Sequence, residues 1–274
     1  MIIKTLVDDI SNSESFGGEH GLSLYIETER HKILFDTGSS GLFAENAKKM
    51  GVDLSKVDLV IISHGHYDHC GGLKTFLGLN SNAKIYISKM ALDEFYSDRP
   101  NGEKKYIGLD KTLLSCNRFI FVEEKLVIDE ELELFSNVKG NRMCPSANDH
   151  LLVKIGETYV HDDFAHEQNL IIKENNKIVL IVGCAHKGII NILEHFKISK
   201  KSNPSHVIGG FHLFNHSSGV YEDSNVISEI GSYLLGTKAK FYTCHCTGIT
   251  AYEELKQIMG DNVFYLSTGN EIKI

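Results

Sequence analysis

The sequence predicts an α/β protein built from two mixed β-sheets with helices on their outer faces. Three observations support this fold class. Short apolar runs rich in β-branched residues recur along the chain, amphipathic helical stretches separate some of them, and the first runs follow one another closely enough to form hairpins. Strands with interspersed helices bury their apolar faces best when sheets pack together and helices cover the outside.

The expected strands share lengths of three to five residues, β-branched or aromatic side chains and flanking turn residues. They are Leu22–Ile26, Lys32–Phe35, Leu59–Ile62, Lys84–Ile87, Leu151–Ile155, Asn169–Ile172, Ile178–Val182, His206–Ile208 and Lys240–Thr243.

The expected helices place apolar side chains three and four residues apart, on one face. They span 41–50, 188–197, 223–235 and 250–259. Gly51 is a suitable C-terminal cap for the first of them, and the third begins with an acidic or serine N-cap.

One domain covering residues 1–274 is expected, because the chain has no repeat, low-complexity tract or proline-rich hinge. The segment from about Met90 to Asn148 is less regular and richer in charge, and we interpret it as an insertion or cap over the site.

Composition excludes several functional classes. No run approaches the roughly 18 apolar residues that span a membrane, and the N-terminus lacks the pattern of a signal peptide. Six scattered cysteines in a chain of this size indicate reduced thiols and a cytoplasmic location. The net charge of -8 argues against a nucleic-acid partner, although a metal pair could still attract a small anionic substrate.

The strongest chemical signal follows the expected strand Leu59–Ile62. His64, His66, Asp68 and His69 lie within six residues, directly after this apolar run. Imidazole and carboxylate groups are ligands for Zn, Fe and Mn, and such a dense cluster after a buried strand predicts a metal site. His64 and His66 can face one ion, while Asp68 and His69 face a second.

This stretch resembles the His-x-His-x-Asp-His signature of the metallo-β-lactamase superfamily, and Asp36 resembles that family's first motif. The resemblance implies a four-layer αβ/βα sandwich with two divalent metal ions at the sheet edges. Zn is expected first, with Fe or Mn as alternatives.

The resemblance also implies a third histidine for the first metal. His150, His161 and His166 are candidates, and we prefer His166 because it directly precedes a strand and stands 18 residues before Cys184. That gap is close to the usual spacing of the family. His161 is the second choice.

Cys184 stands where the family usually has a bridging aspartate, and two interpretations follow. The Cys184 thiolate is the preferred ligand of the second metal, with His186 nearby as a proton-transfer or supporting group. Alternatively, Cys184 packs as a buried thiol and His186 ligates. With a thiolate ligand, we expect a water or hydroxide to bridge the metals.

Two histidines compete for the last ligand position, since both follow apolar strands. We assign His245 to the metal and let His212 face the substrate. Cys244 and Cys246 are interpreted as packed thiols, because no second cysteine pair completes a separate site.

Four further motifs narrow the resemblance to one branch. They are Glu19-His20-Gly21-Leu22-Ser23, the Gly-Cys-Ala-His of 183–186, the Gly-Gly-Phe-His-Leu of 209–213 and the His-Cys-Thr-Gly of 245–248. This set looks like the branch that includes the archaeal 7,8-dihydropterin-6-methyl-4-(β-D-ribofuranosyl)aminobenzene 5'-phosphate synthase.

The leading hypothesis is a metal-dependent hydrolase that activates water against an ester, lactone or phosphoester bond of a small molecule. Asp68 would hold the water, His186 or His212 would protonate the leaving group, and His20 would contact the substrate. The second hypothesis is a transferase joining a pterin pyrophosphate to an arylamine. A third is a metal-binding or redox protein without hydrolytic activity.

Overall fold

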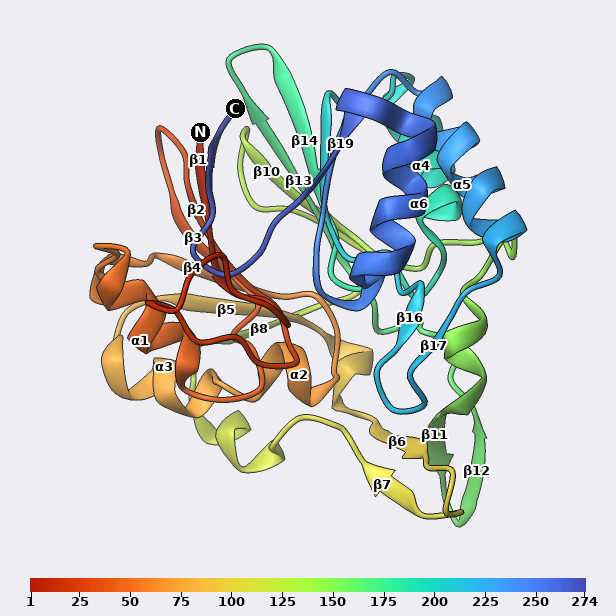
Figure 1. Ribbon diagram of the computed structural model, residues 1–274. Coiled ribbons are helices and arrows are strands. Elements are labelled where there is room, and N and C mark those ends of the chain that lie inside the picture. The colour runs from red at the N-terminus through yellow and green to blue at the C-terminus, as the bar shows by residue number, and fades with distance from the viewer.

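The computed structural model describes all residues 1–274 and contains two seven-stranded mixed sheets that face each other (Figure 1). The first sheet uses the N-terminal part of the chain and the last strand. Its order is β20 (Glu271–Lys273), β1 (Ile2–Val7), β2 (Ser23–Glu27), β3 (Lys32–Phe35), β4 (Leu59–Ile62), β5 (Lys84–Ser88) and β8 (Phe119–Val122).

The second sheet repeats this plan with the C-terminal part of the chain. Its order is β19 (Val263–Tyr265), β18 (Lys240–Thr243), β15 (His206–Gly209), β14 (Lys177–Ile181), β13 (Asn169–Glu174), β10 (Leu132–Phe135) and β9 (Lys125–Val127). In each sheet one half is parallel and the other antiparallel: β3, β4, β5 and β8 run parallel, as do β14, β15, β18 and β19.

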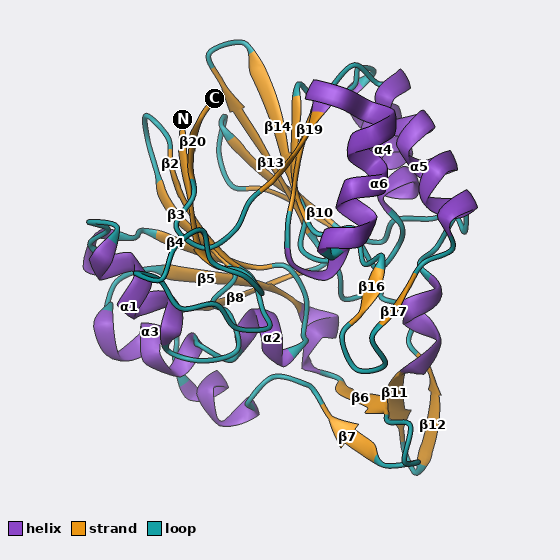
Figure 2. Cartoon of the chain, in the orientation of Figure 1, coloured by secondary structure: helices purple, strands orange, loops and turns teal.

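Helices cover the outer face of each sheet, as Figure 2 shows. Helices α1 (Leu42–Lys49) and α3 (Leu73–Leu79) pack on the first sheet, and α4 (Ile189–Lys200), α5 (Ser224–Gly236) and α6 (Ile249–Met259) pack on the second. The short helix α2 (Tyr67–Cys70) follows β4. Six 3₁₀ helices complete the list: η1 (Leu54–Lys56), η2 (Lys89–Leu92), η3 (Lys111–Ser115), η4 (Ser146–His150), η5 (His245–Thr247) and η6 (Gly260–Asn262).

Strand β4 illustrates why the layers form. Its four residues are all buried, and alternate side chains point to opposite faces. Leu59 and Ile61 belong to the core between the two sheets, whereas Val60 and Ile62 belong to the core under α1 and α3. The predicted four-layer sandwich of two mixed sheets with outer helices is confirmed.

Two smaller sheets lie outside the sandwich. A four-stranded antiparallel sheet has the order β12 (Thr158–His161), β11 (Leu151–Ile155), β6 (Glu94–Asp98) and β7 (Lys104–Tyr106), and β16 (Phe214–Asn215) pairs with β17 (Val220–Tyr221). The first takes two strands from the segment 90–148 and two from the residues that follow it. Figure 1 shows it below the two main sheets, with the β16–β17 hairpin pointing towards it.

No helix of the chain combines the length and apolar character needed to cross a membrane.

His31 connects the two sheets at an edge away from the candidate metal ligands. Its Nδ1 lies 2.8 Å from Asp58 Oδ2, and its Nε2 lies 2.7 Å from Asp129 Oδ2. Burial alone would lower the pKa of His31, but the two carboxylates more than offset it and raise the pKa above its ordinary value.

A raised folded-state pKa predicts that His31 stabilises the protein most below its unfolded pKa of about 6.5. The contribution, about 1 kcal/mol or less for a partly exposed pair, should disappear as the pH rises through the folded-state pKa. Urea unfolding of the wild type and His31→Gln at pH 6 and pH 8.5 measures this. A stability difference that does not shrink at the higher pH would contradict the prediction.

Candidate metal centre

The predicted ligands gather because strands of both sheets end at the same place. His64 and His66 follow β4, Asp68 and His69 lie on α2, Cys184 and His186 follow β14, His212 follows β15, and His245 begins η5 after β18. Carboxyl ends of parallel strands meet at one edge of a sheet, so residues distant in sequence become neighbours.

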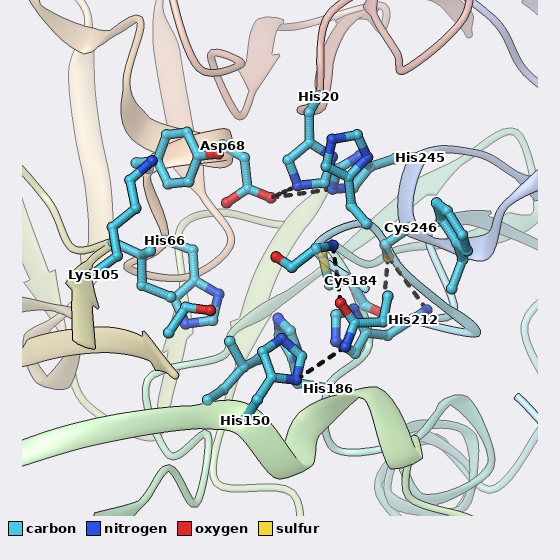
Figure 3. A pocket seen from close by; sticks show the side chains of 18 of the residues that line it. His20, His66, Asp68, Lys105, His150, Cys184, His186, His212, His245 and Cys246 are labelled. Carbon is cyan, nitrogen blue, oxygen red and sulfur yellow. Dashed lines mark hydrogen bonds and ion pairs between the residues drawn. The ribbon is translucent and has the colours of Figure 1, made fainter. Parts of the chain in front are cut away.

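A cavity of about 310 Å³ lies at this edge (Figure 3). Most of the predicted site residues line it: His20, His66, Asp68, Cys184, His186, His212 and His245. Its wall also includes residues of the small sheets, so the cavity lies between the sandwich and the segments outside it.

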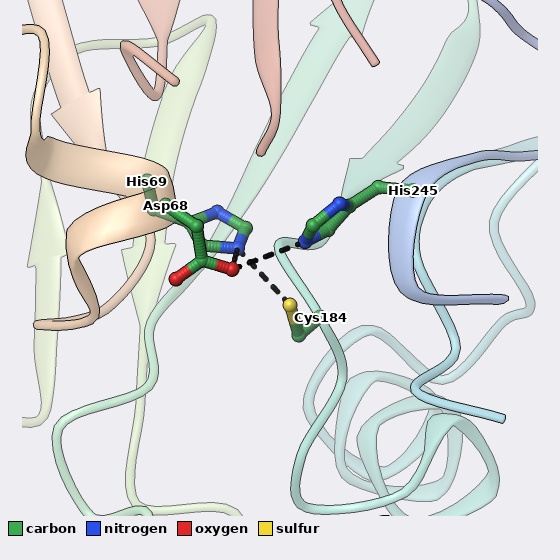
Figure 4. A group of neighbouring side chains, drawn as sticks. All are labelled: Asp68, His69, Cys184 and His245. Carbon is green, nitrogen blue, oxygen red and sulfur yellow. Dashed lines mark hydrogen bonds and ion pairs between the residues drawn. The ribbon is translucent and has the colours of Figure 1, made fainter. Parts of the chain in front are cut away.

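The first group of ligand atoms consists of Asp68, His69, Cys184 and His245, all within 4.8 Å of one another (Figure 4). His69 Nε2 lies 3.0 Å from Cys184 Sγ, and His245 Nε2 lies 3.3 Å from Asp68 Oδ2. All four residues are at least nine-tenths buried. The group combines nitrogen, oxygen and sulfur donors, which suits a borderline metal such as Zn.

Carboxylates hold the far side of both imidazoles in this group. Asp36 Oδ2 lies 2.7 Å from His69 Nδ1, and Asp9 Oδ1 is paired with His245 Nδ1. Burial acts to lower the pKa of both histidines, but the carboxylates of Asp36 and Asp68 raise the pKa of His69, and Asp9 raises that of His245. A carboxylate on Nδ1 orients the ring and leaves Nε2 for a metal, which is the usual outer-shell arrangement.

The second group consists of His64, Cys184 and His186, again with ligand atoms within 4.8 Å. His64 Nδ1 lies 2.8 Å from Ser63 Oγ, and His186 Nδ1 lies 2.9 Å from Asn148 Oδ1. Burial lowers the pKa of both histidines well below the ordinary value. Burial therefore favours the neutral imidazole, the form that binds metals.

His66 lies against this second group. Its ring centroid is 4.6 Å from that of His64 and 5.0 Å from that of His186. Three histidine rings thus converge on one side of Cys184.

Ring nitrogens that lack a hydrogen-bond partner indicate whether these residues suit metal ions. Buried polar atoms normally have a hydrogen-bond partner, and a missing partner costs about 1–3 kcal/mol. Five buried Nε2 atoms have no hydrogen-bond partner within the protein, those of His64, His66, His186, His212 and His245. Two of them only lie near a carboxylate oxygen: His66 Nε2 is 3.8 Å from Asp162 Oδ2, and His245 Nε2 is 3.3 Å from Asp68 Oδ2. Such a concentration of unpaired imidazole nitrogens around one thiol fits metal ligation.

His166, the sequence-based choice for the third histidine, is arranged differently. Its Nδ1 accepts a hydrogen bond from the Gly65 N–H at 3.0 Å, and its Nε2 lies 3.0 Å from Asp162 Oδ2. Both ring nitrogens are therefore engaged by the protein, and the ring groups with His66 and Asp162 rather than with Cys184.

The other two candidates for that position share no group of ligand atoms with Cys184. His161 is exposed on β12. His150 lines the cavity, and burial lowers its pKa to about 4.

Cys184 is shared by three groups of ligand atoms. Besides the two groups above, its sulfur lies within 4.8 Å of ligand atoms of His212 and Cys246. The sulfur thus lies between the two histidine groups and is a donor that they share. A sulfur shared by both groups was not among our sequence-based expectations, which assigned the bridge to water.

His212 and His20 face the cavity from opposite sheets. Neither ring nitrogen of His212 has a partner, and its ring centroid is 4.2 Å from that of His186. His20 Nδ1 lies 3.2 Å from Asp9 Oδ2, and its Nε2 lies 3.5 Å from Asp68 Oδ2.

Four strand-end residues of the site adopt the left-handed conformation although none is glycine: Asp36, Ala185, His212 and His245, with φ between 48° and 59°. Such conformations cost about 1 kcal/mol or more each and cluster at functional sites. The fold therefore holds these side chains in place against a local backbone preference.

Sequence reasoning missed three residues that hold the ligands. Asp9 contacts His245 from a loop, and Asn148 contacts His186 from η4. Asp162, in a loop, lies 3.0 Å from His166 Nε2 and 3.8 Å from His66 Nε2. Asp9 was open to prediction, because it follows the apolar run Ile2–Val7 just as Asp36 follows its own strand. Asn148 and Asp162 carry no such local signal.

Comparisons with known proteins agree with this geometry. The sequence pattern of the metallo-β-lactamase superfamily matches residues 16–140. A solved structure described as a metal-dependent hydrolase of the β-lactamase superfamily is 33% identical, covers 100% of this chain and 99% of its own, and superposes with a TM-score of 0.83. The chain belongs to the metallo-β-lactamase superfamily.

Two relatives within this superfamily come from Methanocaldococcus jannaschii. An uncharacterized protein is 32% identical over 279 residues and covers 100% of both chains. The 7,8-dihydropterin-6-methyl-4-(β-D-ribofuranosyl)-aminobenzene-5'-phosphate synthase is 27% identical over 300 residues, covering 99% of this chain and 96% of that protein. The resemblance to the pterin synthase branch is confirmed at this level of identity.

Proposed function

We propose that the protein is a hydrolase that uses two divalent metal ions to cleave an ester, lactone or phosphoester bond of a small molecule. The observation that carries this proposal is the set of unpaired, buried Nε2 atoms around the Cys184 sulfur. The 33% identical metal-dependent hydrolase supports the same class of activity. Zn is the expected metal, with Fe or Mn as alternatives.

The ligand sets of the two ions follow from the two groups, with His66 added to the second group because its ring lies against those of His64 and His186. His64, His66 and His186 would hold one ion. Asp68, His69 and His245 would hold the other, and Cys184, which belongs to both groups of ligand atoms, would be available to either ion. When bound, the metal pair supplies positive charge that acidifies a water molecule and polarises the substrate.

The remaining residues of the cavity orient the substrate and move protons. Asp68 is placed to accept a proton from the attacking water. His212 has two unpaired ring nitrogens at the cavity wall, so it is suited to protonate the leaving group. His20 lies beside Asp68 and would contact the substrate. The six unpaired cysteines support a cytoplasmic location.

A transferase that joins a pterin pyrophosphate to an arylamine is the second candidate. It is favoured by the 27% identity to the pterin synthase over nearly the whole of both chains. The same ligand groups would serve, with an amine in place of water as the attacking group.

Turnover by the metal-loaded protein distinguishes these candidates. We expect hydrolysis in a panel of p-nitrophenyl acetate, an acyl lactone and bis(p-nitrophenyl) phosphate, abolished by a chelator and restored by added Zn²⁺. A parallel reaction offers a pterin pyrophosphate with an arylamine. Product in that reaction, with no cleavage in the panel, would reject the hydrolase in favour of the transferase.

A further inference from the structure

The hairpin formed by β6 and β7 presents one of its faces to the cavity. The strand register places Ser97 opposite Lys105, and Asp98 opposite Lys104. Because side chains alternate between faces, Ser97, Arg99 and Lys105 share one face. All three line the cavity that also contains the candidate metal ligands. Figure 3 shows Lys105 and Cys246 at opposite sides of this cavity.

The two faces of the hairpin differ in how their charges are paired. On the outer face, Lys104 forms an ion pair with Asp98. On the cavity face, neither Arg99 nor Lys105 is paired with a carboxylate, and the Arg99 guanidinium donates instead to Ser217 Oγ. Two basic side chains without a carboxylate partner therefore face the cavity of a chain whose net charge is -8.

Ser97 supplies an independent observation. Its side chain is 3% exposed, and its Oγ has no hydrogen-bond partner within the protein. A buried hydroxyl without a partner is costly, so it indicates a polar group of a ligand at this position. The apolar side chains of Ile107 and Leu151 line the same cavity and could contact the rest of such a ligand.

We propose that Arg99, Lys105 and Ser97 form a subsite for a phosphate group that the substrate carries away from the bond that reacts. A phosphate monoester has up to two negative charges and several acceptor oxygens, matching two cations and a hydroxyl donor. The inference rests on the proposed function, because it names the class of substrate bound at that site. Binding of such a remote group positions the substrate, and its binding energy can lower the barrier to the reaction at the metals.

Calorimetric titration of the metal-loaded protein with phenyl phosphate and with inorganic phosphate tests the subsite. We expect Arg99→Gln and Lys105→Gln each to raise the Kd for phenyl phosphate about tenfold, the loss of one charge-assisted hydrogen bond. Lys104→Gln is the matched control, since it removes the neighbouring charge from the other face, and its Kd should stay within about twofold of the wild type. Circular dichroism checks that each variant is folded.

Two outcomes would overturn the subsite. An unchanged Kd in both Arg99→Gln and Lys105→Gln would mean that phosphate binds at the metals alone. An equal effect of Lys104→Gln and Lys105→Gln would mean that the overall charge attracts the anion. We also expect phenyl phosphate to bind more tightly than inorganic phosphate, and the reverse order would reject an organic phosphate as ligand. If the hydrolysis panel fails while these binding differences hold, the proposed function is wrong and the subsite stands.

Discussion

Replacing Cys184 by alanine is expected to reduce bound metal from two equivalents per chain to less than one. The sulfur lies within 4.8 Å of ligand atoms in both histidine groups, so its loss removes a donor available to either ion. A bound metal ion contributes several kcal/mol to the stabilisation of a transition state, and 1.36 kcal/mol corresponds to a tenfold change in rate. Turnover should therefore fall about 1000-fold.

Elemental analysis of the purified variants measures this directly. Cys244→Ala is the matched control, because Cys244 is equally buried but packs in the apolar core between the sheets and belongs to no group of ligand atoms. It should keep both equivalents of metal. Two full equivalents in Cys184→Ala would mean that Cys184 is only a packed thiol.

Replacing His186 by alanine should remove bound metal, whereas replacing His166 by alanine should mainly lower the stability of the fold. His186 Nε2 is unpaired beside Cys184, so its removal should cost one metal equivalent. The affinity for that ion should fall by more than about 100-fold. Loss of a residue that only supports a ligand lowers metal affinity by up to about 100-fold, and loss of the ligand itself should lower it further. His166 is hydrogen-bonded to Gly65 and Asp162, so its removal should mainly lower stability.

Metal content and thermal unfolding of the two variants form one experiment. His166→Ala should keep two equivalents of metal and show a lower Tm, because a buried N–H and a buried carboxylate lose their partner. The opposite pattern, with metal lost in His166→Ala and kept in His186→Ala, would restore His166 as the third ligand.

Much of the fold could be predicted because its elements are encoded locally. The expected strands at Lys32–Phe35, Leu59–Ile62 and Lys240–Thr243 have the observed bounds. The third expected helix begins where anticipated, since Asp223 caps it by accepting a hydrogen bond from the Asn225 N–H. Period-two and period-3.6 patterns are properties of neighbouring residues, so they can be read without the tertiary structure.

The small four-stranded sheet was not predictable in the same way. Strand β7 is only three residues long and largely exposed, so it has no apolar pattern. Its pairing with β6, and that of β6 with β11, joins segments separated by irregular chain. The cations of the cavity face therefore could not be recognised as a group.

The sequence by itself determined the kind of chemistry. Three histidines and an aspartate follow β4 so closely that any fold ending that strand at a loop would bring metal ligands together. Only the tertiary structure decided which other nitrogens remain available. His166 and His186 both lie near strand ends, but the Gly65 N–H, 101 residues from His166, engages one of them, and Asn148 orients the other. Whether an imidazole can bind a metal depends on the partner of each ring nitrogen, and those partners come from distant parts of the chain.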